Sequence, residues 1–93
     1  MDKERAAEVL SEQLQSYRGK RYSDLKGMIG DLAAYGVPNP DGDEFQIEIE
    51  VRWDGKPNGD IRVLGAIDDG GWSAFSPLSD SFIMTPEGIF LGE

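Results

Sequence analysis

Two adjacent aspartates, Asp68 and Asp69, are the residues whose types and spacing could most directly do chemistry. They stand in the segment AIDDGGWSAF, residues 66–75. A hard metal ion would need about six oxygen ligands, and neighbouring side chains of an extended chain point to opposite sides. Aspartate and glycine are also what tight turns favour, because the carboxylate accepts local backbone N–H bonds and glycine adopts positive φ. We predict a turn at residues 68–71 and keep the two aspartates as a candidate acidic site.

The composition removes the side chains that most enzymes use. The chain has no histidine and no cysteine, which excludes imidazole bases, thiol nucleophiles, thiolate zinc sites and disulfides. It contains no Walker loop, Rossmann glycine set, nucleophile elbow or zincin helix. The segment NPDGDEF, residues 39–45, spaces its oxygen-bearing side chains like a calcium loop, but its glycine is misplaced, which favours a linker. We predict no enzyme, no cofactor, and no catalytic or metal-binding residue.

The charge is strongly acidic and unevenly distributed. The net charge is −9, which disfavours nucleic acid and anionic membranes as partners. Residues 1–30 hold six basic and five acidic residues, and residues 31–93 hold three basic and thirteen acidic ones. A basic cluster near the end of the first predicted helix could grip an anion or simply complement the helix dipole: Arg18, Lys20, Arg21 and Lys26. The N-terminus lacks the apolar stretch of a signal peptide, and we expect a cytoplasmic protein.

The first part of the chain has the apolar spacing of helices. An amphipathic helix is predicted from Asp2, its N-cap, to a stop at Gly19. Its apolar stripe is Ala7, Leu10, Leu14 and Tyr17. A second helical piece is expected in YSDLKGMIGDLAAYG, residues 22–36. The helical part therefore spans residues 2–35, and the turn-rich residues 36–44 form a hinge.

The period changes to two in EFQIEIEVRW, residues 44–53, which is typical of a strand with one buried face. After a turn, IRVLGAID continues as a second strand. We predict, within a shift of two residues, the register that pairs Trp53 with Ile61 and Ile47 with Ile67, because a slip of one residue would turn one apolar face to solvent. The next hairpin is predicted to turn at residues 68–71 and to place Trp72 opposite Ile67.

The rest of the chain is predicted to complete the sheet. Pro77 interrupts the third strand because it has no N–H to donate. Extended structure continues through LSDSFIMT, and IFLGE forms a short final strand. The sheet thus covers residues 45–91 of a single domain, 1–93. The predicted fold class is α+β, with one or two N-terminal helices packed on an antiparallel β-meander of about four strands.

The wet face of this sheet carries a candidate interface. The predicted register places Leu64 beside Phe75, among charged residues that include Arg52 and Arg62. Apolar surface rimmed with charge often marks a contact site. Cross-strand packing alone would also explain the Leu64 and Phe75 pair.

The segment IDDGGWSAFSPLSDSFIMTPEGIFLGE, together with YSDLKGMI upstream, resembles a family of small uncharacterised bacterial proteins. The resemblance covers residues 22–93 and is most specific over residues 67–83. It implies an α+β domain and supplies no activity and no site residues. A helix on a curved antiparallel sheet is also similar in outline to cystatin-like and NTF2-like folds.

Two functional hypotheses follow. The first is a non-enzymatic acidic interaction module that forms a homodimer through its sheet or binds a basic protein partner. The second is a small-ligand-binding or enzymatic domain, with Asp68 or Asp69 as its acidic group. Its pocket would lie between the first helix and the sheet, lined by Tyr17, Tyr22, Trp53 and Trp72. Alternating aromatic residues are more often core than pocket, which favours the first hypothesis.

Overall fold

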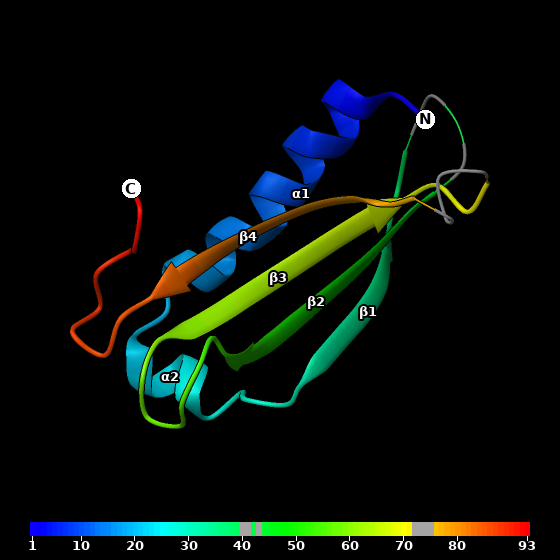
Figure 1. Cartoon of the computed structure of the whole chain (residues 1–93). Helices are drawn as coiled ribbons and strands as arrows, with labels where there is room; N and C mark the ends of the chain where they lie inside the picture. The colour runs from blue at the N-terminus through cyan, green and yellow to red at the C-terminus, as the bar shows by residue number, and fades with distance from the viewer. Residues whose placement is uncertain (40–41, 43, 72–75) are drawn as a thin grey trace.

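Two helices precede four strands in the computed structural model, which describes residues 1–39, 42, 44–71 and 76–93 (Figure 1). The elements are α1 (Lys3–Arg18), α2 (Tyr22–Lys26), β1 (Leu32–Val37), β2 (Phe45–Trp53), β3 (Ile61–Asp68) and β4 (Leu78–Met84). The strands form one antiparallel sheet in the order β1-β2-β3-β4. The predicted α+β class, helices on a four-stranded antiparallel sheet, is confirmed.

Helix α1 begins and ends as its sequence predicts. The Asp2 carboxylate accepts a hydrogen bond from the Arg5 N–H at 3.1 Å, and Gly19 is the C-cap. The buried residues are Ala6, Val9, Leu10 and Leu14. The predicted stripe was therefore wrong at Ala7, which is exposed. The true stripe is turned so that Ala6 and Val9 face the core with the two leucines.

The second predicted helix is much shorter than residues 22–36. Helix α2 ends at Lys26, and Leu32–Val37 is strand β1, so the sheet begins at residue 32 and the helical part does not reach residue 35. Gly30 has φ +91 and donates its N–H to the Val51 carbonyl at 2.9 Å. This turn sends the chain alongside β2, where strand pairing overrides the helix propensity of Leu and Ala in β1.

The pairing of β2 with β3 has the predicted register. Trp53 lies opposite Ile61 and Ile47 opposite Ile67. Alternate residues of both strands are buried on the side of the sheet that carries α1, which we call the inner face. The core comprises Ala6, Val9, Leu10, Leu14, Leu25, Phe45, Ile47, Ile49, Val51, Ile61, Val63, Ile67, Phe82 and Met84.

The pairing of β3 with β4 differs from the prediction. Ile67 lies opposite Leu78, not opposite Trp72, and the connection between the strands spans residues 69–77 rather than residues 68–71. Trp72 itself lies outside the described residues. Pro77 precedes β4, where a residue without an N–H is tolerated. The predicted final strand reduces to one bridge between Phe90 and Met84.

Helix α1 lies over β3 and β4, and β1 is the strand farthest from it (Figure 1). Gly65 permits the close approach, because a Cβ atom there would lie 2.8 Å from Leu10 Cδ1. The sheet face opposite α1, which we call the outer face, has no helix over it among the described residues. Within the described ranges, this asymmetry leaves the outer face and the β1 edge without a covering element.

Candidate functional site

The outer face is built from alternating residues of the four strands. One cross-strand row runs Ala34, Glu48, Ala66 and Ser79, and the next runs Leu32, Glu50, Leu64 and Ser81. These residues face outward because their neighbours in sequence face the core, and a strand alternates its side chains. Two adjacent rows of small, apolar and acidic side chains therefore cross the outer face of the sheet.

A hollow of about 290 Å³ lies over these rows. Leu64 and Ala66 supply apolar surface, and Glu48 and Glu50 stand beside it. The space exists because small side chains flank Glu48, with Ala34 on one side and Ala66 on the other. Leu32, which is 60% exposed, forms the wall on the β1 side.

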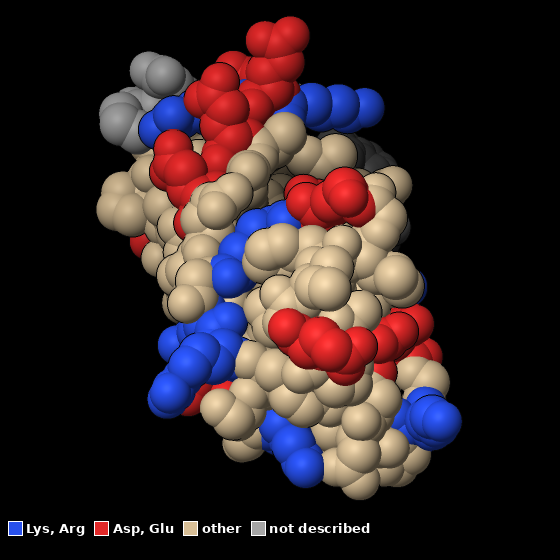
Figure 2. Space-filling model, turned by 90° about the vertical axis from the view of Figure 1, so that its left-hand side faces the viewer, with Lys and Arg blue, Asp and Glu red and all other residues tan. Residues whose placement is uncertain are grey.

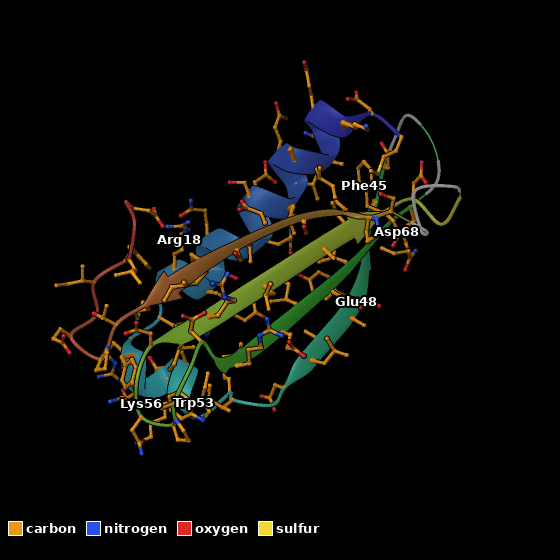
Figure 3. The ribbon with its side chains drawn as sticks, viewed as in Figure 1. Arg18, Phe45, Glu48, Trp53, Lys56 and Asp68 are labelled. Atoms are coloured by element: carbon orange, nitrogen blue, oxygen red, sulfur yellow. The ribbon has the colours of Figure 1, made fainter. Side chains whose placement is uncertain are left out.

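The two glutamates of the hollow differ in their partners. Arg52 Nη1 lies 3.5 Å from Glu50 Oε1, a long ion pair between exposed groups. Among the described residues, no cation and no hydrogen-bond donor pairs with Glu48, which projects from the middle of β2 (Figure 3). Glu48 is therefore a carboxylate held over apolar surface and open to a donor from outside.

The candidate interface residues are placed in part as predicted. Leu64, Arg52 and Arg62 all belong to the outer face. Arg62 donates to Asp54 at 2.8 Å and to Ser81 at 3.2 Å, so its guanidinium is engaged within the sheet.

The neighbour predicted for Leu64 was wrong. Leu64 pairs with Ser81 on β4, because the connection between β3 and β4 is longer than predicted. Phe75 itself lies outside the described residues. Leu32, which completes the hollow, was missed because β1 was predicted as helix.

The two aspartates of the opening segment turn the chain. Asp68 Oδ1 accepts the Gly70 N–H at 2.8 Å, and Asp69 Oδ1 accepts the Gly71 N–H at 3.2 Å. Gly70 has φ +81, the conformation for which turns select glycine. In the described part of the chain no three acidic side chains come together as a metal site would require. The carboxylates act here as turn acceptors.

Three of the four aromatic residues proposed to line a pocket pack against the core, and the fourth, Trp72, lies outside the described residues. The three are Tyr17, Tyr22 and Trp53, and the Tyr22 hydroxyl donates to the Gly59 carbonyl at 2.7 Å. Trp53 and Asp68 stand at opposite ends of the sheet (Figure 3). One pocket therefore does not contain both groups.

Two of the four residues of the basic cluster, Arg18 and Arg21, form ion pairs with acidic neighbours. Arg18 Nη1 lies 2.7 Å from a Glu93 carboxylate oxygen, and its guanidinium stacks 4.8 Å from the Phe82 ring centroid. The Arg21 backbone N–H donates to Asp24, which lowers the pKa of that carboxyl below its usual 3.8. Viewed from this end, basic atoms are scattered among acidic and uncharged ones (Figure 2). This arrangement favours the structural interpretation of the cluster over an anion site.

A second hollow, of about 280 Å³, lies between the end of α1 and the inner face near β1. Its lining is mainly apolar and includes Tyr17, Met28, Ala33, Ile49 and Val51. It exists because α1 sits over β3 and β4 and leaves the inner side of β1 only half covered.

Tyr35 reaches from β1 to α1, where its hydroxyl donates to Gln13 Oε1 at 2.7 Å. Burial, and secondarily Tyr17, raises the pKa of Tyr35 above the ordinary 10.0. The neutral phenol is thus favoured by folding, and its contribution to stability is complete below pH 10.0 and lost as pH rises through the higher folded pKa. In an ultraviolet titration we expect Tyr35→Phe to remove a tyrosinate transition that lies above pH 10.0. An unchanged titration in Tyr35→Phe would contradict this assignment.

Comparisons with family models, curated proteins and solved structures return no match to this chain. The resemblance of residues 67–83 to a small bacterial family stays a prediction. No helix in the described ranges is both long and apolar enough to span a membrane.

Proposed function

We propose that the protein is a non-enzymatic, cytoplasmic interaction module that binds a basic segment of a partner protein through the outer face of its sheet. One observation carries the proposal. Glu48 stands without a described partner between Ala34 and Ala66, beside a hollow whose apolar surface is Leu64 and Ala66.

A lysine or arginine side chain fits this combination. Its aliphatic stem can lie on Leu64 and Ala66, while its charged end reaches Glu48 and Glu50. Replacing water around an open carboxylate by a cationic donor does not leave a buried charge unpaired, because Glu48 is exposed in the free protein. The hollow therefore supports recognition of a basic side chain rather than of an anion.

The charge of the whole chain supports the same partner. A net charge of −9 draws basic molecules toward the protein and repels acidic ones. The thirteen acidic residues that follow residue 30 include both glutamates of the hollow. Because the carboxylates are exposed, added salt screens them, and binding is expected to weaken as ionic strength rises.

The glutamates of the hollow can be tested against glutamates elsewhere. We expect Glu48→Gln/Glu50→Gln to weaken binding of a lysine octapeptide about tenfold, since two rim ion pairs contribute up to about 1 kcal/mol each. The measurement is isothermal titration calorimetry at low and at physiological salt. The control Glu12→Gln/Glu87→Gln makes the same change in net charge at exposed positions outside the sheet. An equal loss of affinity in both double variants would show that the peptide is attracted by the net charge of the protein and not bound at a specific site.

The second hollow favours a second candidate function, the binding of a small apolar molecule between α1 and the sheet. Its mainly apolar lining and volume of about 280 Å³ suit a ligand of a few carbon atoms more than a large cofactor. Native protein would then bind an apolar fluorescent dye, and Ala33→Phe, which fills the hollow, would abolish that binding. Dye binding unaffected by Ala33→Phe would end this candidate.

A further inference from the structure

Strand β1 is an open edge of the sheet. The strand order makes β1 and β4 the two edges. The C-terminal segment covers part of the β4 edge, where the Leu91 N–H donates to the Ile83 carbonyl at 2.9 Å and Phe90 bridges Met84. Beside β1, the only strand that pairs within the described ranges is β2.

The hydrogen bonds of the sheet show which groups of β1 point outward. The Val51 N–H donates to the Asp31 carbonyl at 3.3 Å. The backbone groups of the odd-numbered residues therefore form the hydrogen bonds between β1 and β2. On the other side of β2, the Asp54 N–H donates to the Asp60 carbonyl at 2.9 Å. The even-numbered residues of β2 therefore bond toward β3, which agrees with its odd-numbered residues bonding toward β1. The N–H and C=O groups directed at the open edge are therefore those of Leu32, Ala34 and Gly36.

The side chains of β1 do not protect this edge. Edge strands are normally blunted by charged side chains or an internal proline. The sequence of β1 is LAAYGV, without a charge, whereas each of the other three strands carries at least one charged residue. Leu32 is 60% and Tyr35 37% exposed on this strand. In a chain of net charge −9, β1 is the strand where two copies can meet without opposing carboxylates.

We propose that two copies of the chain pair β1 with β1, antiparallel, about a twofold axis at Ala34, to form one continuous eight-stranded sheet. This register joins Leu32 to Gly36 of the second copy and adds about six backbone hydrogen bonds from the three outward residues of each strand. Because even-numbered residues meet even-numbered ones, both outer faces stay on the same side of the sheet.

Each large residue of β1 is paired with a small residue in this register. Leu32 comes beside Gly36 of the second copy, over which the Glu44 side chain of that copy lies, and Tyr35 comes beside Ala33. Asp31 comes beside Val37 rather than beside a second Asp31, as it would in a parallel pair. The pairing leaves the hollow beside Glu48 open, so it does not depend on the proposed binding of a basic partner.

The mass of the particle in solution tests the pairing. We expect the wild-type protein to have twice the chain mass of 10.2 kDa by analytical ultracentrifugation. Ala34→Pro removes an N–H that points to the open edge, and Ala34→Lys places like charges together at the twofold axis. Each change is expected to halve the mass while circular dichroism stays that of the folded chain. If the Ala34→Pro variant does not fold, the mass of the Ala34→Lys variant tests the pairing.

Ser79→Lys is the matched control, because Ser79 is exposed on β4 at the other end of the same cross-strand row as Ala34. It should keep the doubled mass. A wild-type monomer at millimolar concentration, or Ala34→Lys that dimerises as tightly as Ser79→Lys, would overturn the proposal. In the dimer, hydrogen exchange at the amides of Leu32, Ala34 and Gly36 should slow as protein concentration rises.

Discussion

Replacing Phe82 by alanine is expected to lower the free energy of unfolding by about 3–5 kcal/mol. Phe82 is 3% exposed, and its ring meets Phe90 edge-to-face with centroids 5.6 Å apart. The Arg18 guanidinium lies 4.8 Å from the same ring centroid. Truncation leaves a cavity and also removes the aromatic support of Arg18 and of the C-terminal segment, so the loss exceeds that of the area alone.

Urea denaturation followed by circular dichroism measures this loss. Ile89→Ala is the matched control in the same region, because Ile89 is 63% exposed and its truncation should cost less than about 0.5 kcal/mol. A loss below about 1 kcal/mol for Phe82→Ala would mean that the C-terminal segment is not held as the structure places it.

The contact between Leu10 and Gly65 gives the second large effect. Leu10 is 1% exposed, and Leu10→Ala is expected to cost about 2–5 kcal/mol by opening a cavity under α1. Gly65→Ala alone is expected to cost about 1–3 kcal/mol, because its new Cβ would lie 2.8 Å from Leu10 Cδ1. In the double variant the alanine at 65 fits the space that Leu10 vacates.

A double-mutant cycle measures this coupling. The double variant should be more stable than the sum of the single losses predicts, by about 1 kcal/mol or more. Leu25→Ala, at a buried position away from Gly65, supplies the control pair and should be additive with Gly65→Ala. If the stability losses of Leu10→Ala and Gly65→Ala are additive, Leu10 does not pack against Gly65 as the structure places it.

The sequence predicts the centre of the fold better than its edges. Strict alternation from Phe45 to Trp53 and again from Ile61 limits the pairing to registers that differ by two residues. The predicted register among these, with Trp53 opposite Ile61, is observed. Strand β1 escaped prediction because its Leu and Ala residues suit a helix equally well, and only pairing with β2 makes them a strand. The β3 and β4 register escaped because Asp and Gly predict a turn and not the length of a connection.

The candidate site follows the same division. Leu64, Arg52 and Arg62 could be assigned to the outer face from alternation alone. The hollow could not be predicted, because it needs Leu32 at one side and small residues on both sides of Glu48, and those neighbours come from strands distant in sequence.

Chemical-shift mapping tests most directly the central claim that the outer face binds a basic protein segment. Unlabelled lysine octapeptide would be added to the ¹⁵N-labelled protein at physiological salt. The claim predicts the largest amide changes at Glu48, Glu50, Leu64 and Ala66, with smaller changes along α1. Largest changes on the exposed side of α1, or changes spread evenly over all acidic residues, would contradict it.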